Sequence, residues 1–314
     1  MTWERTAFDV IVFEWGDSML SRVARSYVVA PDRARGEAFF AALAHWRTEV
    51  RSEILVFSDG GFTKSDKLFR AVQHASFDQL VLGDDLARQI RDDFRNFLAS
   101  ADVYADAGVP WRRGALFVGP PGNGKTLCVK ALVRELAVPC IYVQSFEVPY
   151  GTAKGAIDVV FKRAREQAPC VLVLEDIDAL LVPGSTSFFL NELDGFASNA
   201  GVITIATTNH PERLDPSILE RPSRFDRTYH FGLPAEATRR AYAALWNERL
   251  RPALRLDAAA IAEVARLTDG FSFAYIQEMF VSSTMQWMQS REDGGIRRIA
   301  VEQIRLLREQ MSRA

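Results

Sequence analysis

The spacing of apolar and polar residues divides the chain into three regions. Residues 1–77 contain short β-like runs and one stretch, RGEAFFAALAHWRTEV, with apolar residues at helical spacing, which predicts a small α+β domain. Residues 78–232 alternate continuously apolar strands with helical segments, a pattern typical of a parallel sheet with helices on both faces. Residues 233–314 are helical in pattern. The expected architecture is therefore a doubly wound α/β domain between a small α+β domain and a helical lid.

Start and stop signals predict where the lid helices begin and end. Asp257 is expected to cap one helix, and Ser272, after Gly270, to open the next. The segment REDGGIRR at 291–298 is predicted to be a flexible connection. The four helices are expected at residues 235–250, 257–268, 272–290 and 300–313.

Composition narrows the choice of partners. The 314 residues are 48% hydrophobic and 25% charged, enough for a substantial core, and the formal net charge of -2 gives no basic field, so nucleic acid is not an expected partner. The longest apolar runs, such as ALFV and VLVL, are far shorter than the ~20 residues that span a bilayer, and the N-terminus MTWERTAFDV lacks a signal-peptide layout. We therefore expect a cytoplasmic protein without a membrane span, whose three cysteines are small buried hydrophobes.

The strongest chemical signal is the stretch GALFVGPPGNGKTLCVKALVREL. A strand at 115–118 runs into a glycine-rich loop, and an apolar-faced helix follows. In this order, loop N–H groups can wrap a phosphate chain, Lys125 can neutralise the β- and γ-phosphates, and the Thr126 hydroxyl can bind Mg²⁺. The residues expected to bind the nucleotide here are Gly119, Pro120, Pro121, Gly122, Asn123, Gly124, Lys125, Thr126 and Leu127.

Two carboxylates follow a second buried strand in the sequence VLVLEDID. Glu175 and Asp176 would emerge at the carboxyl end of this strand, the edge where open α/β sheets bind ligands. By position Glu175 takes the metal role and Asp176 orients or deprotonates the attacking water. The more usual order is Asp then Glu, and the exchange moves the base by about 1 Å unless the backbone compensates. Asp178 is either a helper at a subunit boundary or a cap for the turn.

A third strand, VITIATTNH, ends at Asn209, whose amide can hold the attacking water near the γ-phosphate. Farther along, Asp215 and Pro216 are expected to open a short helix that closes at Arg221. Arg221 and Arg224 can supply positive charge to the transition state in a neighbouring subunit. The alternative is an ion pair of these arginines with Glu220 or Asp226.

The motifs GPPGNGKT, VLVLEDID, NELDGF, ATTNHPERLDPSILERPSRFDR and DGFSFAYIQ together resemble the AAA family of ATPases over about residues 78–290. The Glu-Asp order and the segment from VLGDDL to the phosphate loop are most similar to the Rieske-protein translocase subfamily and its bacterial relatives. The resemblance implies a doubly wound sheet with a helical lid, a hexameric or heptameric homo-oligomeric ring, ATP and Mg²⁺ between subunits, and a protein client.

The same resemblance implies roles for individual residues. Lys125 and Thr126 match the phosphate loop, Glu175 and Asp176 the acidic pair, Asn209 the first sensor, and Arg221 and Arg224 the arginines that act on the neighbouring subunit. It further implies that Val81, Leu82 and Gly83 contact adenine, and that Asp194, Gly195 and Phe196 signal the nucleotide state between subunits. Asp84 or Asp85 is expected to cap the helix that follows the adenine segment.

Departures from the family pattern keep three functions open. Tyr150 and Gly151 in EVPYGTAKG are offset by one place from the loop that grips polypeptide in many relatives, and the segment IDALLVPGSTSFFL is too short for a long second pore loop. Ala274 stands where the wider superfamily often has an arginine. We expect an ATPase ring that remodels a protein client. The alternatives are an ATP-gated scaffold and, less favoured, a nucleic-acid motor.

Overall fold

The computed structural model describes residues 2–3, 6–18, 21–48, 53–83, 85–194, 198–219, 224–290 and 295–312. Its contacts separate two compact units, Met1–Arg51 and Ser52–Ala314. This division lies upstream of the domain boundary expected at residue 77, because the strands after residue 53 join the central sheet. In the described residues no helix is both long enough and apolar enough to cross a membrane.

The first unit is built on a long antiparallel hairpin. Its aromatic cluster joins Phe39 of α1 to Phe8 and Trp3, with ring centroids 4.8 Å and 5.6 Å from that of Phe39. The expected α+β composition of this part is therefore present. Its elements are β1 (Thr2–Trp3), β2 (Thr6–Ala7), β3 (Asp9–Ser18), β4 (Ser21–Val29) and α1 (Arg33–Thr48).

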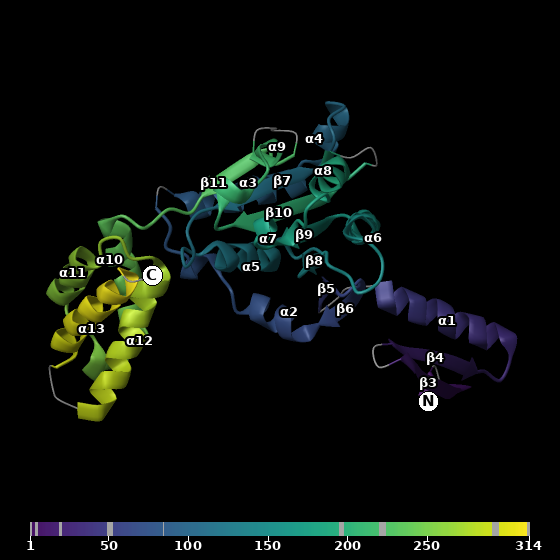
Figure 1. The fold of residues 1–314 in the computed structure, drawn as a ribbon, viewed down its shortest axis with the longest axis horizontal. Coiled ribbons are helices and arrows are strands. Elements are labelled where there is room, and N and C mark those ends of the chain that lie inside the picture. Colours follow the sequence, from purple (N-terminus) through teal and green to yellow (C-terminus); the bar gives the residue numbers. More distant parts are fainter. Residues whose placement is uncertain are drawn as a thin grey trace. The chain divides into compact units, whose positions relative to one another are not determined.

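The second unit is organised around a seven-stranded sheet with the strand order β11-β7-β10-β9-β8-β5-β6 (Figure 1). All neighbouring strands are parallel except β6, which pairs antiparallel with β5. This confirms the predicted mostly parallel α/β sheet. The strands are β5 (Ile54–Ser58), β6 (Gly61–Ser65), β7 (Arg113–Val118), β8 (Cys140–Val143), β9 (Cys170–Leu174), β10 (Val202–Thr208) and β11 (Arg227–His230).

Helices cover both faces of this sheet. Val171 and Val173 of β9 belong to the hydrophobic core that packs against α2, α3 and α5, while the alternate residues Leu172 and Leu174 are equally buried on the opposite face, where α6 and α8 pack. Continuous burial of β9 follows from this two-sided cover. The helices are α2 (Asp66–Gln73), α3 (Leu86–Ala99), α4 (Ala101–Asp106), α5 (Lys125–Leu136), α6 (Ala153–Gln167), α7 (Ile177–Leu180), α8 (Thr186–Asp194) and α9 (Pro216–Leu219), with 3-10 turns at Phe77–Gln79 and Pro211–Arg213.

The lid has its own hydrophobic core, which includes Phe271, Ile276 and Ile304. Asp257 accepts a hydrogen bond from the Ala260 N–H, which confirms the predicted cap. The predicted flexible segment 291–298 was too long, because α13 already begins at Ile296. The lid elements are α10 (Glu236–Glu248), a 3-10 turn at Pro252–Leu254, α11 (Ala258–Leu267), α12 (Phe273–Ser290) and α13 (Ile296–Met311).

Candidate functional site

The glycine-rich loop between β7 and α5 has a backbone that depends on glycine at two positions. Gly119 and Gly122 have φ values of 152° and 78°. A Cβ atom at Gly119 would lie 2.1 Å from the carbonyl oxygen of Phe231, and one at Gly122 would lie 2.7 Å from the Cβ of Ala274. The Ala274 N–H donates to the Gly122 oxygen at 3.1 Å. The first turn of the lid helix α12 therefore rests directly on the loop, and neither glycine has room for a side chain.

Lys125, the first residue of α5, is buried and has three hydrogen-bond acceptors. Its Nζ donates to the carbonyl oxygens of Gly119 and Pro120 and, at 2.7 Å, to Oδ1 of Asn209. Burial lowers the pKa of Lys125 below its ordinary value of 10.5, although Asp176 and two other nearby carboxylates act in the opposite direction. This ammonium group therefore stays charged in spite of its desolvation cost, and a phosphate at the loop would have to replace one of its three acceptors.

The lowered pKa predicts how nucleotide binding changes in alkaline solution. Deprotonation of Lys125 removes the positive charge that an anion would contact, and it occurs at a lower pH than for an ordinary lysine. We expect ATP affinity to begin falling below pH 10.5, measured by calorimetric titration with a non-hydrolysable ATP analogue. In Lys125→Met, which has no proton to lose at this position, this part of the pH dependence should disappear. An unchanged profile in the variant would contradict the assignment.

The acidic pair follows β9 and is connected to Lys125 through β10. Asp176 has a left-handed backbone with φ 50°, and its N–H donates to the Thr207 hydroxyl oxygen at 3.0 Å. Its Oδ1 accepts from Nδ2 of Asn209 at 2.9 Å. Since the Asn209 oxygen accepts from Lys125, the amide joins the ammonium group to the carboxylate. The structure thus brings together three of the side chains that the sequence singled out for catalysis or binding.

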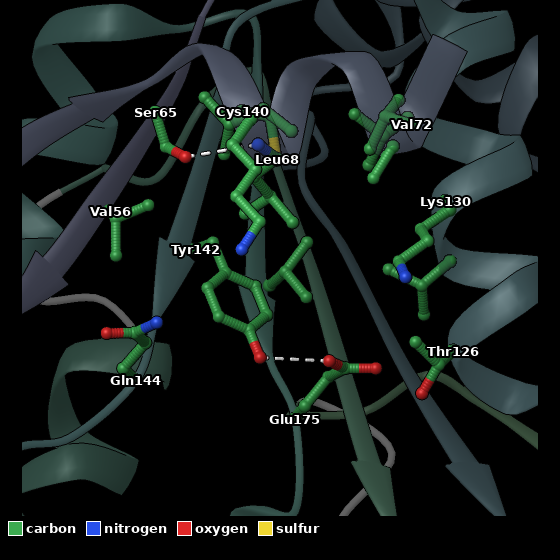
Figure 2. Close-up of a pocket in the computed structure, with 16 residues that line it drawn as sticks. Val56, Ser65, Leu68, Val72, Thr126, Lys130, Cys140, Tyr142, Gln144 and Glu175 are labelled. Atoms are coloured by element: carbon green, nitrogen blue, oxygen red, sulfur yellow. Dashed lines mark hydrogen bonds between the residues drawn. The ribbon is translucent and has the colours of Figure 1, made fainter. Parts of the chain in front are cut away.

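Glu175 has two differently placed carboxylate oxygens. Oε2 accepts from the Tyr142 hydroxyl at 3.0 Å, whereas Oε1 is buried and has no hydrogen-bond partner among the described residues. Figure 2 shows this second oxygen pointing towards Thr126. A carboxylate oxygen beside a threonine hydroxyl is a donor set that suits Mg²⁺. Thr126 and Glu175 therefore fit the expected metal position, while Tyr142 was not found by sequence reasoning.

The expected adenine segment lies beside the loop. A Cβ atom at Gly124 would be 3.8 Å from Cδ2 of Leu82. Leu82 and Gly83 line an open pocket of about 1210 Å³ together with Thr238 and Phe273 of the lid. Thr238 belongs to none of the motifs found in the sequence. Phe273 lies within DGFSFAYIQ, but nothing in that motif indicated a position beside the adenine segment. Asp85 occupies the N-cap position of α3, but among the described residues its side chain makes no capping hydrogen bond. Asp84, the other expected cap, lies outside the described residues.

The arginines and the segment 194–196 are described only in part. Arg221, Gly195 and Phe196 lie outside the described residues. Arg224 is buried; its Nε is 2.9 Å from Oδ2 of Asp194, and its guanidinium also donates to the Ser217 carbonyl. The alternative partner expected from sequence, Asp226, instead pairs with Arg113. In this chain Arg224 therefore holds the end of α8 to α9.

This contact predicts a stability effect at Arg224. Arg224→Ala removes a buried charge-assisted hydrogen bond and leaves the Ser217 oxygen without this donor, so the free energy of unfolding is expected to fall by about 1–3 kcal/mol. Partial exposure of Asp194 keeps the value below that of a fully buried pair. Urea unfolding measures the change, with Arg227→Ala, an exposed arginine 4.0 Å from Asp93, as control. Equal effects of the two substitutions would contradict the prediction.

The structure also shows the surroundings of Asp178 and Tyr150, two other residues that the sequence singled out. Oδ1 of Asp178 accepts from the Thr208 hydroxyl at 2.7 Å, which ties α7 to the end of β10 and is not a cap of the turn. Tyr150 is 75% exposed, next to Gly151, so its ring is accessible to a partner. The gripping role suggested for Tyr150 stays a prediction.

The sequence is similar to a known protein family and to several proteins of known activity. Residues 115–233 match the family model described as "ATPase family associated with various cellular activities (AAA)". The chain is 39% identical over 203 residues to the ATP-dependent zinc metalloprotease FtsH of Acidothermus cellulolyticus, covering 59% of this chain and 30% of that protein. It is 34% identical over 242 residues to the ATP-dependent zinc metalloprotease FtsH 1 of Symbiobacterium thermophilum, covering 72% of this chain and 40% of that protein. It is 37% identical over 215 residues to the mitochondrial inner membrane m-AAA protease component AFG3L2 of Mus musculus, and this match covers 62% of this chain and 26% of that protein. The matches span two fifths or less of each of these relatives.

Proposed function

We propose that the chain forms a homo-oligomeric ring and uses the hydrolysis of ATP to ADP and phosphate to remodel a protein client. The match of residues 115–233 to the AAA ATPase family model supports this proposal. The observation that carries this proposal is the hydrogen-bonded series from Lys125 through Asn209 to Asp176 at the glycine-rich loop. It joins a group that can bind phosphate to a group that can accept a proton.

The chain's own residues divide the work of hydrolysis. The loop N–H groups and Lys125 bind the β- and γ-phosphates, and Leu82 and Gly83 contact adenine. Thr126 and Glu175 hold Mg²⁺, which when bound neutralises phosphate charge. Asn209 orients the attacking water, and Asp176, whose carboxylate is exposed, takes its proton. The hydrogen bond from Asn209 places the base in spite of the exchanged Glu-Asp order.

The ring proposal rests on Arg221, Arg224 and the segment 194–196, whose positions in AAA proteins lie at the boundary between subunits. In this chain Arg224 and Asp194 already contact each other, so a change in one is transmitted to the other. Nucleotide-dependent movement of Asp194 would then move Arg224. This is the simplest route by which one subunit's state reaches the next.

Assembly predicts that ATP turnover depends on protein concentration. Specific activity of the wild type should rise as light scattering shows the mass increasing from monomer to ring. Arg221→Ala should assemble normally, bind ATP normally and lose about 10³-fold or more of the turnover, because it removes transition-state charge supplied by the neighbouring subunit. A monomer that hydrolyses ATP as fast as the assembly, together with a silent Arg221→Ala, would contradict the ring proposal.

A second function, an ATP-gated scaffold that does not thread its client, is favoured by one observation. The chain between Asp176 and Asp194 consists of α7, a short turn and α8, which leaves no long loop for a second pore contact. Turnover measured with and without an unfolded polypeptide separates the two functions. Stimulation supports client remodelling, whereas slow turnover that no polypeptide stimulates supports the scaffold.

Several finer assignments belong to the same proposal. The Glu-Asp order and the segment before the phosphate loop support membership of the Rieske-protein translocase subfamily, although the matches described above are to FtsH and AFG3-type proteins. We also propose a cytoplasmic location, which cell fractionation tests. Domain roles are proposed as client or partner binding for residues 1–77, nucleotide binding for 78–232 and the lid for 233–314. Proteolysis is not proposed, because the matches span so little of the proteases.

A further inference from the structure

The sheet register places a tyrosine next to the acidic pair. Tyr142 of β8 is the partner of Val173 of β9. Side chains alternate between the two faces of a strand, so Glu175, two residues after Val173, projects on the same face as Tyr142. The Tyr142 hydroxyl therefore reaches the Glu175 carboxylate from the side, and the two oxygens are 3.0 Å apart.

The Tyr142 ring lies beside an apolar cavity. The ring forms part of the wall of a pocket of about 330 Å³ with a mainly apolar lining, which includes Val56 of β5 and Val72 of α2 (Figure 2). Val56 is also the register partner of Tyr142. A tyrosine hydroxyl is protonated at neutral pH, so it can donate a hydrogen bond to the Glu175 carboxylate. The Glu175 carboxylate therefore has a protonated hydroxyl beside it, on a ring whose backbone is fixed by the pairing of β8 with β5 and β9.

The hydrogen bond from Tyr142 restricts the orientation of the Glu175 carboxylate. A glutamate has one more rotatable bond than an aspartate, so its carboxylate can take more orientations at the end of the strand. Fixing Oε2 on the tyrosine leaves Oε1, which is buried and has no hydrogen-bond partner in the described part of the chain, on the side of Thr126. One hydrogen bond therefore selects the carboxylate orientation in which the second oxygen faces the proposed metal position.

We propose that Tyr142 is a positioning residue that fixes the metal-binding orientation of Glu175. The inference rests on the proposed nucleotide function and extends it to a residue outside the phosphate loop, acidic pair and arginines. Tyr142 acts through Glu175 and does not touch the metal. Partners of this kind orient metal ligands, and their loss typically weakens metal binding about 10- to 100-fold.

The test compares two tyrosine substitutions in the full chain. Tyr142→Phe removes only the hydroxyl. Tyr229→Phe is the matched control, because Tyr229 is also a strand tyrosine, here buried, whose hydroxyl bonds a carboxylate, Oδ2 of Asp93, at 2.7 Å. Mn²⁺ binding is titrated by electron paramagnetic resonance in the presence of saturating ADP, and nucleotide binding without metal and thermal unfolding are measured on the same samples. We expect Tyr142→Phe to bind Mn²⁺ about 10-fold or more weakly, with metal-free nucleotide affinity unchanged, and Tyr229→Phe to match the wild type.

A second comparison separates positioning from general packing. In Glu175→Asp the shorter carboxylate no longer reaches the tyrosine, so adding Tyr142→Phe should weaken Mn²⁺ binding no further. Wild-type Mn²⁺ affinity in Tyr142→Phe, equal losses in both tyrosine variants, or a full further loss in the double variant would each overturn the inference while leaving the ATPase proposal standing. A wild-type chain that binds neither nucleotide nor Mn²⁺ would overturn both.

Discussion

Asp176→Asn is expected to lower ATP turnover about 10³-fold while ATP still binds. Asparagine keeps an Oδ1 atom that can accept the hydrogen bond from Asn209, so the shape of the site and the loop are preserved. What disappears is the negative charge and the capacity to take a proton from the attacking water, and general-base catalysis contributes about 10²- to 10⁴-fold. Single-turnover hydrolysis, with bound nucleotide measured separately, gives the result.

Asp178→Asn is the matched control for this substitution. It makes the same chemical change two residues later, and the asparagine retains an oxygen for the Thr208 hydroxyl. Its turnover should stay within a few-fold of the wild type. If instead both variants lose turnover equally, Asp176 is not the unique base. If Asp176→Asn remains active, water activation comes from Glu175 or from the substrate itself.

Lys125→Met should weaken ATP binding about 10- to 100-fold and reduce turnover further. The substitution keeps an unbranched side chain but removes the ammonium group, and hydrogen bonds to charged groups contribute about 1.5–3 kcal/mol each. Methionine removes the desolvation cost of the charge but also leaves the Gly119 and Pro120 oxygens without this donor, so the two effects oppose each other and the thermal stability should change little. Calorimetric titration of ATP and a thermal melt measure the two effects.

Lys130→Met is the control, because this lysine lies on the same helix but lines the apolar pocket next to Tyr142. It should bind ATP like the wild type. Comparable loss of affinity in both variants would mean that positive charge along α5, and not the specific place of Lys125, holds the phosphates. A loss of stability in Lys125→Met would indicate that the hydrogen bonds to the Gly119 and Pro120 oxygens organise the loop.

Sequence reasoning located the candidate site where local pattern and topology agree. The glycine-rich loop, the acidic pair and Asn209 each follow an apolar strand, and the carboxyl ends of parallel strands meet at one edge of a sheet. That rule alone predicts the meeting of Lys125, Asp176 and Asn209, and the structure shows their hydrogen bonds. The lid was predictable for a similar reason, since caps such as Asp257 mark helix starts locally.

The remaining features depend on which segments become neighbours across the sheet. Tyr142 is 33 residues from Glu175, and only the adjacency of β8 and β9 brings the two side chains together. The hairpin β5–β6 was assigned to the N-terminal region because its turn signal is local, whereas pairing with β8 is a tertiary property. The ion pair of Arg224 with Asp194 was likewise missed, because arginine partners cannot be deduced from spacing across 30 residues.

The burial of the cysteines makes the chain suitable for optical labelling. Cys128, Cys140 and Cys170 are all buried free thiols, and burial raises the pKa of each above its ordinary range. Thiol-reactive dyes should therefore not label these three native cysteines. Cysteines introduced at the exposed positions Val103 and Met288, one in the sheet domain and one in the lid, can carry a donor and an acceptor without removing any natural cysteine. Energy transfer between them would follow the lid through each round of ATP binding and product release.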